Sequence, residues 1–145
     1  MDKKTGVGLF AARLGVGAIF LVSALGKLAA WGGTVTYAGS KGVPPILLAG
    51  ATALELVGAL SLLLGWRARH GAAALIVFLV PVTFVFHAFW AAQGAEVQMQ
   101  IVQFLKNVAI AGGLVAIVVS GPGPVSVDAR RRAARSVGAP AKVGA

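Results

Sequence analysis

The sequence contains no cysteine among its 145 residues. Disulfide bonds, thiolate catalysis, cysteine-ligated zinc and iron–sulfur clusters are therefore excluded within this chain. Because membrane proteins of many origins lack cysteine, the absence does not indicate a compartment.

Charged residues are scarce as well. Only 12% of the chain is charged, with four acidic residues in all, whereas 58% is hydrophobic and the mean hydropathy is +0.87. A soluble domain of this length would need more polar surface to face water. The composition predicts an all-α integral membrane protein, organised as one four-helix bundle.

Histidine is limited to His70 and His87, which lie 17 residues apart on one predicted helix, about 25 Å along its axis. They cannot ligate the same haem iron, and with one central carboxylate they cannot complete a zinc or di-iron site. The glycines of "GVGLFAARLG" begin a membrane helix rather than follow a strand, so they do not indicate a phosphate loop. We predict no metal and no intrinsic cofactor; a redox role would use an organic molecule such as a quinone, or a cofactor carried by a partner.

Four segments have the roughly 20 apolar residues needed to cross a membrane. They cover residues 9–31, 44–65, 71–92 and 100–120, and together form one domain over 9–120. Residues 1–8 precede this domain, and a basic segment at 121–145 follows it, beginning with two Gly–Pro pairs that end the fourth helix. We expect this segment to be a disordered tail. The connector "GGTVTYAGSKGVP" is interpreted as a longer external loop.

The distribution of positive charge predicts the topology. Lysine and arginine gather before the first span, between spans two and three, and in the tail: Lys3, Lys4, Arg67, Arg69, Arg130, Arg131, Arg132, Arg135 and Lys142. The other two connectors contain one basic residue, Lys41, and one acidic residue, Glu96. Both termini are therefore expected in the cytoplasm of a bacterium. Membrane topology accounts for the net charge of +9, so nucleic acid is not expected as a partner.

An alternative for the N-terminus is a cleaved signal peptide, because Lys3 and Lys4 precede an apolar run. Against this, Arg13 interrupts the run and Lys27 lies near the point where cleavage would occur.

Seven polar side chains interrupt the spans: Arg13, Lys27, Glu55, His87, Gln103, Lys106 and Asn107. Glu55 lies near the membrane midplane, Arg13 lies on the inner side, and the other five lie in the outer half. Buried charges in lipid cost a few kcal/mol and usually pair inside the bundle. We expect Lys106 or Lys27 to pair with Glu55, a candidate proton carrier, and the remaining members to form a ligand-binding pocket around it.

Structural explanations of the same residues stay open. Arg13 and Lys27 lie near span ends, from which long side chains reach the headgroups. A Glu55–Lys106 pair would also serve to fix the helix register, and His87 would also serve as a packing residue near the interface.

The four spans resemble, in order, those of the DoxX family. The resemblance covers residues 9–128 and rests on "ARLGVGAIFLVSALGKL", "GATALELVGALSLLLGWRAR", "PVTFVFHAFW" and "FLKNVAIAGGLVAIVVSGPGPVSVD". It implies a small four-helix inner-membrane protein. The family takes its name from a subunit linked to a terminal quinol oxidase and to thiosulfate:quinone oxidoreduction. Other members are described as scaffolds that join a sulfurtransferase and a superoxide dismutase at the membrane.

Three functional hypotheses follow. The chain is a redox-associated subunit with a polar pocket for a quinone or small substrate, or a non-catalytic scaffold or assembly factor for a partner protein, or a pathway for a small solute or protons. In the first, Glu55 manages a proton while His87, Lys106 and Asn107 bind carbonyl oxygens. At most the chain would be a subunit of a quinone-linked oxidoreductase. The surrounding lipid, redox proteins and a second copy of the chain are the candidate partners.

Overall fold

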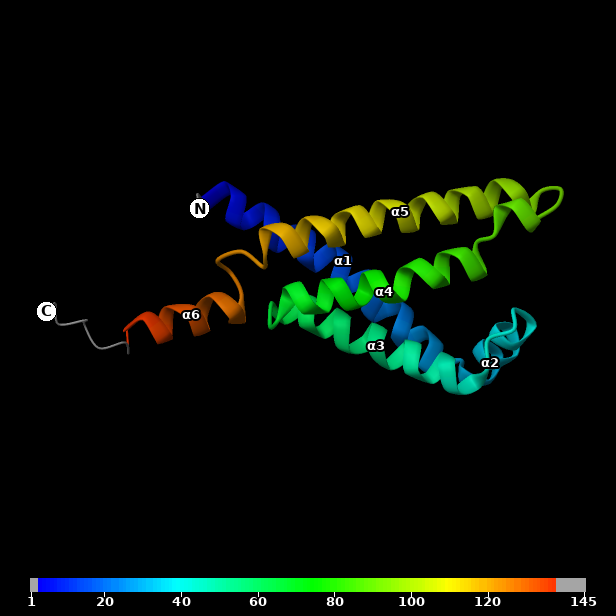
Figure 1. Ribbon diagram of the computed structural model, residues 1–145, viewed down its shortest axis with the longest axis horizontal. Helices are drawn as coiled ribbons and strands as arrows, with labels where there is room; N and C mark the ends of the chain where they lie inside the picture. Colours follow the sequence, from blue (N-terminus) through cyan, green and yellow to red (C-terminus); the bar gives the residue numbers. More distant parts are fainter. Residues whose placement is uncertain (1–2, 138–145) are drawn as a thin grey trace, which may run out of the picture.

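A computed structural model describes residues 3–137 of the chain. Within that range it contains helices and no strand (Figure 1): α1 (Lys3–Ala29), α2 (Trp31–Ser40), α3 (Pro45–Leu64), α4 (Ala68–Phe86), the short 3₁₀ helix η1 (Phe89–Ala91), α5 (Glu96–Ser120) and α6 (Val127–Val137). Four stretches are long and apolar enough to cross a membrane: Lys4–Ala29, Pro45–Leu64, Ala68–Ala91 and Glu96–Ser120. The predicted all-α bundle with four membrane helices is confirmed.

The ends of the helices follow from local sequence. Pro44 is extended and Pro45 opens α3, because proline has the backbone angle of a helix start and lacks the N–H that would stay unpaired there. Gly65 ends α3 in the left-handed conformation, with φ of 66°. The turn at Gly65 sends the chain directly back into α4, so α3 and α4 form an antiparallel hairpin.

The hairpin is the centre of the bundle, since α1 packs mainly on α3 and α5 mainly on α4. The two outer helices have only a small contact with each other. Figure 1 shows that α2 and the α4–α5 connection lie at one end of the bundle, and that the N-terminus and α6 lie at the other. These are called the α2 end and the α6 end below.

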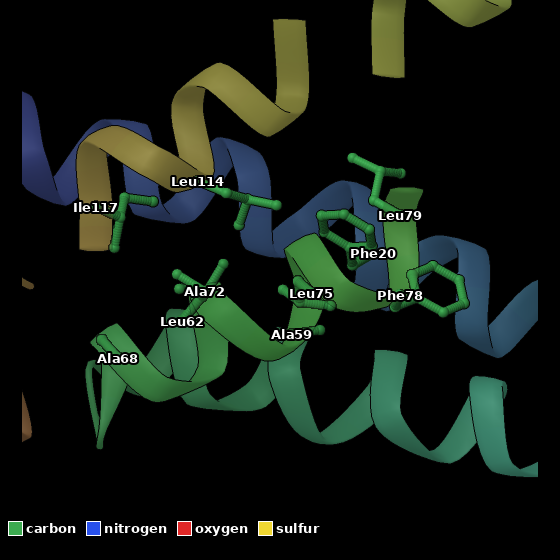
Figure 2. Close-up of a cluster of buried hydrophobic side chains, with 10 residues drawn as sticks. All are labelled: Phe20, Ala59, Leu62, Ala68, Ala72, Leu75, Phe78, Leu79, Leu114 and Ile117. Atoms are coloured by element: carbon green, nitrogen blue, oxygen red, sulfur yellow. The ribbon is translucent and has the colours of Figure 1, made fainter. Parts of the chain in front are cut away.

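A cluster of buried apolar side chains joins α1, α3, α4 and α5, with Leu62, Leu75 and Leu114 fully buried (Figure 2). The α3–α4 contact is close at Gly58, where an added Cβ would lie 2.6 Å from a side-chain carbon of Leu75. Many large apolar side chains point outward instead, such as Val22, Val57 and Val77, as expected for helices that face lipid.

Two segments differ from the sequence-based expectation. Residues 31–40, interpreted as part of an external loop, form helix α2, which packs on α1 and α3 through the buried Ala38. Residues 127–137, interpreted as part of a disordered tail, form helix α6. Ser126 begins α6 as its cap, because its hydroxyl accepts a hydrogen bond from Ala129 N at 3.1 Å. Residues 138–145 of the predicted tail lie outside the described range.

Candidate functional site

The carboxylate of Glu55, in the middle of α3, forms an ion pair with Lys27 on α1. Lys27 Nζ lies 2.6 Å from Glu55 Oε2 and also donates to Ser23 Oγ at 2.7 Å, one turn earlier on α1. The Glu55 side chain is 2% exposed, whereas that of Lys27 is 26% exposed. The pair therefore has a buried acidic member and an accessible basic one.

The ion pair explains how a charge is accommodated within an apolar helix. A single charge in the hydrocarbon region is costly, and a partner at hydrogen-bond distance offsets part of that cost. Lys27 also lies 5.7 Å from the centre of the Phe78 ring on α4, close enough for a cation–π contact. Of the two predicted partners for Glu55, the structure brings Lys27 to it.

A cavity of about 480 Å³ opens beside this pair, toward the α2 end. The parts of α1, α3 and α4 nearest the α2 end form its walls, and α2 covers it with Thr34, Tyr37 and Ala38. Apolar side chains dominate the lining, among them Leu47, Phe78 and Phe86. Lys27 is the charged residue of the lining, so the cavity is an apolar chamber that lies beside one half of the ion pair.

The predicted polar residues of α4 and α5 lie elsewhere. His87 Nδ1 is 3.0 Å from Gln100 Oε1, and Asn107 Nδ2 donates to Thr83 Oγ1 at 3.0 Å. The first pair joins the residue that ends α4 to α5, and the second joins α4 itself to α5.

Lys106 is exposed and donates to Gln103 Oε1 at 3.2 Å. None of His87, Gln103, Lys106 and Asn107 lines the cavity beside Lys27. The structure separates the predicted cluster into an α1–α3 ion pair and an α4–α5 set, because α4 stands between α3 and α5.

Arg13 lies at the α6 end and is 1% exposed. Its guanidinium group donates to the carbonyl oxygens of Pro122 and, at 2.8 Å, of Val125. Arg13 thus holds the segment after α5 against α1. It does not line the cavity beside Lys27.

Asp128 is a structural residue that the sequence analysis did not single out. Its two carboxylate oxygens accept hydrogen bonds from Arg67 N at 2.8 Å and Ala68 N at 3.1 Å, which caps the start of α4 from the start of α6. Its own N–H donates to Gly65 O at 3.0 Å. The only local signal was the Ser–x–Asp sequence before a basic helix, typical of a helix start.

The chemistry available at the cavity is that of one ion pair. Within residues 3–137, histidine, aspartate and glutamate do not gather in a group of three that could hold a metal ion. The Lys27 ammonium has three N–H donors, and Ser23 and Glu55 use two of them. The third has no hydrogen-bond partner among the described residues.

Comparisons with known proteins agree with this architecture. Residues 8–88 match the DoxX family, and residues 51–133 match the SURF4 family. The chain is 33% identical over 124 residues to the inner membrane protein YphA of Escherichia coli K12, a match that covers 84% of this chain and 89% of YphA. It is also 33% identical over 128 residues to the inner membrane protein YqjF of the same organism, with 88% and 95% covered. No solved structure matches the chain.

Proposed function

The chain belongs to the DoxX family of inner-membrane proteins, and from that premise we propose that it is a membrane subunit that binds an apolar small molecule with an oxygen-bearing headgroup, such as a quinone. The observation that carries the proposal is that Lys27, which is paired with the buried Glu55, is the charged residue in the lining of a mostly apolar cavity.

The cavity suits this class of ligand in size and polarity. A volume of about 480 Å³ is within the range of small-molecule sites, which are mostly apolar with a few placed polar groups. A quinone ring or an apolar chain would pack against Leu47, Phe78 and Phe86. A carbonyl oxygen would accept the third N–H of Lys27.

Glu55 acts through Lys27 in this proposal. The carboxylate is too buried to meet a ligand first, but it fixes the position of the ammonium group. Reduction of a quinone to a quinol takes up two electrons and two protons. Lys27 would donate one proton to a ligand oxygen and become a neutral amine beside the Glu55 carboxylate. The second proton, and the one that recharges Lys27, would come from water outside the bundle. The electrons would come from a redox partner, since the lining of the cavity contains no redox group of its own.

The test is native mass spectrometry of the protein extracted gently from its own membrane, followed by titration with decylubiquinone. We expect a bound small molecule in the wild type, and about a tenfold loss of decylubiquinone affinity in Lys27→Gln, since removal of one charged hydrogen bond costs about 1.5 kcal/mol. Glu55→Gln tests the buried member of the pair, and we expect it to lower the affinity for decylubiquinone as well, because it removes the carboxylate that holds Lys27 in position. Lys106→Gln is the matched control, because it removes a lysine that lies in a span but outside the cavity.

A bundle that is empty as extracted, ignores decylubiquinone and carries a stoichiometric protein would contradict the proposal. That result would favour the scaffold hypothesis, in which the Lys27–Glu55 pair only joins α1 to α3. A proton or solute flux in vesicles that Glu55→Gln abolishes would instead favour a transport pathway.

A further inference from the structure

A second cavity, of about 370 Å³, lies at the α6 end, between the α3–α4 turn and α6. Its charged lining consists of five arginines and one aspartate: Arg67, Arg69, Arg131, Arg132, Arg135 and Asp128. We call it the arginine groove. It is separate from the cavity beside Lys27, and no residue lines both.

The aspartate offsets only one of the five positive charges, and it forms no ion pair with any of these arginines. Both of its carboxylate oxygens accept backbone N–H groups at the start of α4, at 2.8 and 3.1 Å. Within residues 3–137, no hydrogen bond or ion pair involves the guanidinium groups of the groove, and all five arginine residues are exposed. Arg67 and Arg131 instead flank the ring of Trp66, at 5.7 and 6.0 Å from its centre.

This cluster of arginines favours the binding of an anionic ligand. Five like charges around one concave surface repel one another, and a ligand with several negative or partly negative oxygens would relieve that repulsion. The planar fork of arginine matches the oxygens of a phosphate group, to which it can donate two parallel hydrogen bonds.

The position of the groove indicates that the phosphate group belongs to a lipid. Leu64, the last residue of α3, is 57% exposed, so the lipid-facing surface reaches the level of the groove. Trp66 follows two residues later and is half-exposed, which is typical of side chains at the membrane–water boundary. Arg69 lies in the first turn of α4. A phosphate held here is therefore at the depth of lipid headgroups.

We propose that the arginine groove binds the phosphate headgroup of an anionic phospholipid, held between the α3–α4 turn and α6. The acyl chains would lie along the exposed apolar surface of α3. The helical structure of α6 fits this role, because it places Arg131, Arg132 and Arg135 in the lining of the groove, near the α3–α4 turn.

The test compares two double variants of the full chain, each lacking two positive charges at the α6 end. Arg69→Gln with Arg132→Gln removes one arginine from each wall of the groove. Lys4→Gln with Arg130→Gln is the matched control, because both residues are exposed at this end and neither lines the groove. The readout is retention of dioleoylphosphatidylglycerol against dioleoylphosphatidylcholine by native mass spectrometry from mixed micelles.

We expect the wild type and the control to retain phosphatidylglycerol selectively, and the groove variant to lose about 20-fold in affinity, since each arginine near an anionic surface contributes about fivefold. Circular dichroism checks that the groove variant is folded, and Arg135→Gln alone gives a milder second test. Lys27→Gln should leave lipid retention unchanged, so this proposal and the proposed function can fail separately.

Two results would overturn the proposal. Equal losses in the groove variant and the control would mean a diffuse attraction of the basic end for lipid, with no site. Displacement of phosphatidylglycerol by millimolar inorganic phosphate would assign the groove to a soluble phosphate compound.

Discussion

At the scale of single residues, the two buried charges of the membrane helices have different roles. Glu55 is paired with a side chain that faces a cavity, whereas Arg13 is bonded to backbone carbonyl oxygens at the α6 end. In the first arrangement, one N–H of Lys27 has no hydrogen-bond partner among the described residues. The second holds one segment of the chain in place.

The Lys27–Glu55 pair gives a stability prediction. Lys27→Met should lower the free energy of unfolding by about 2–3 kcal/mol, because it leaves the Glu55 carboxylate buried without a partner. The double variant with Glu55→Leu should recover most of that loss, since apolar replacements of both partners leave no unpaired charge. Unfolding in mixed micelles would measure both. Additive losses in the double variant would show that the two residues are not energetically coupled.

Arg13 gives a second prediction at this scale. Arg13→Lys keeps the positive charge but cannot bridge the carbonyl oxygens of Pro122 and Val125 with one planar group. We expect the segment around residues 121–128 to open more often, with roughly tenfold faster hydrogen exchange at Asp128 N, which is bonded to Gly65 O. Exchange in α2 should not change, and an effect there of the same size would point to general destabilisation.

At the scale of elements, the turn between α3 and α4 is the most constrained connection. Gly65 has φ of 66°, and a Cβ added to it would lie 2.5 Å from Ser126 Cβ and 2.9 Å from Arg13 Cζ. The turn therefore needs glycine for two separate reasons, its backbone angle and the close approach of the α6 segment.

A matched pair of substitutions separates these reasons. Gly42 also has positive φ, 76°, but nothing lies within 4 Å of an added Cβ. Gly42→Ala should cost about 1 kcal/mol from backbone strain alone. Gly65→Ala should cost about 2–3 kcal/mol, because displacement of Ser126 and Arg13 adds to the strain. Equal thermal stabilities of the two variants would mean that the α6 segment moves away from the turn without cost.

The structure also shows which elements the sequence could predict. The four membrane helices were predictable from the length of the apolar segments. Helix α2 was missed because "WGGTVTYAGS" is rich in glycine and threonine, which are weak helix formers. Its stabilising contacts are tertiary, including Tyr37 against Phe86 of α4 at 5.6 Å between ring centres.

The sequence predicted how deep in the membrane each polar residue of the candidate site lies. It did not predict which neighbouring helix each side chain faces. Lys27 and Lys106 both lie toward the α2 end, so span positions alone made either one a partner for Glu55. The packing order decides between them, because α3 packs on α1 and α5 packs on the far side of the hairpin. The helix cap provided by Asp128 could not be predicted either, because it depends on tertiary packing. Asp128 accepts a hydrogen bond from Arg67 N, which is 61 residues away in the sequence.

At the scale of the whole molecule, the two ends of the bundle differ in charge. The α6 end carries Arg67, Arg69 and the arginines of α6, whereas the connection between η1 and α5 at the α2 end contains no lysine or arginine. Such an asymmetry orients membrane proteins with the basic end in the cytoplasm. The arginine groove would then face the inner leaflet, and the α2 cover of the Lys27 cavity would lie toward the opposite side.

This orientation can be tested by cysteine labelling, for which the native sequence provides a background without thiols. Ser136→Cys places a single thiol on exposed α6, and Gln93→Cys places one in the exposed connection at the α2 end. In intact cells, a membrane-impermeant maleimide should label Gln93→Cys and leave Ser136→Cys unlabelled until the membrane is permeabilised. Both variants should react fully in detergent, which controls for thiols hidden by the fold. The reverse pattern would place the arginine-rich end outside the cytoplasm, contrary to the charge rule, and the groove would then meet the lipids of the outer leaflet.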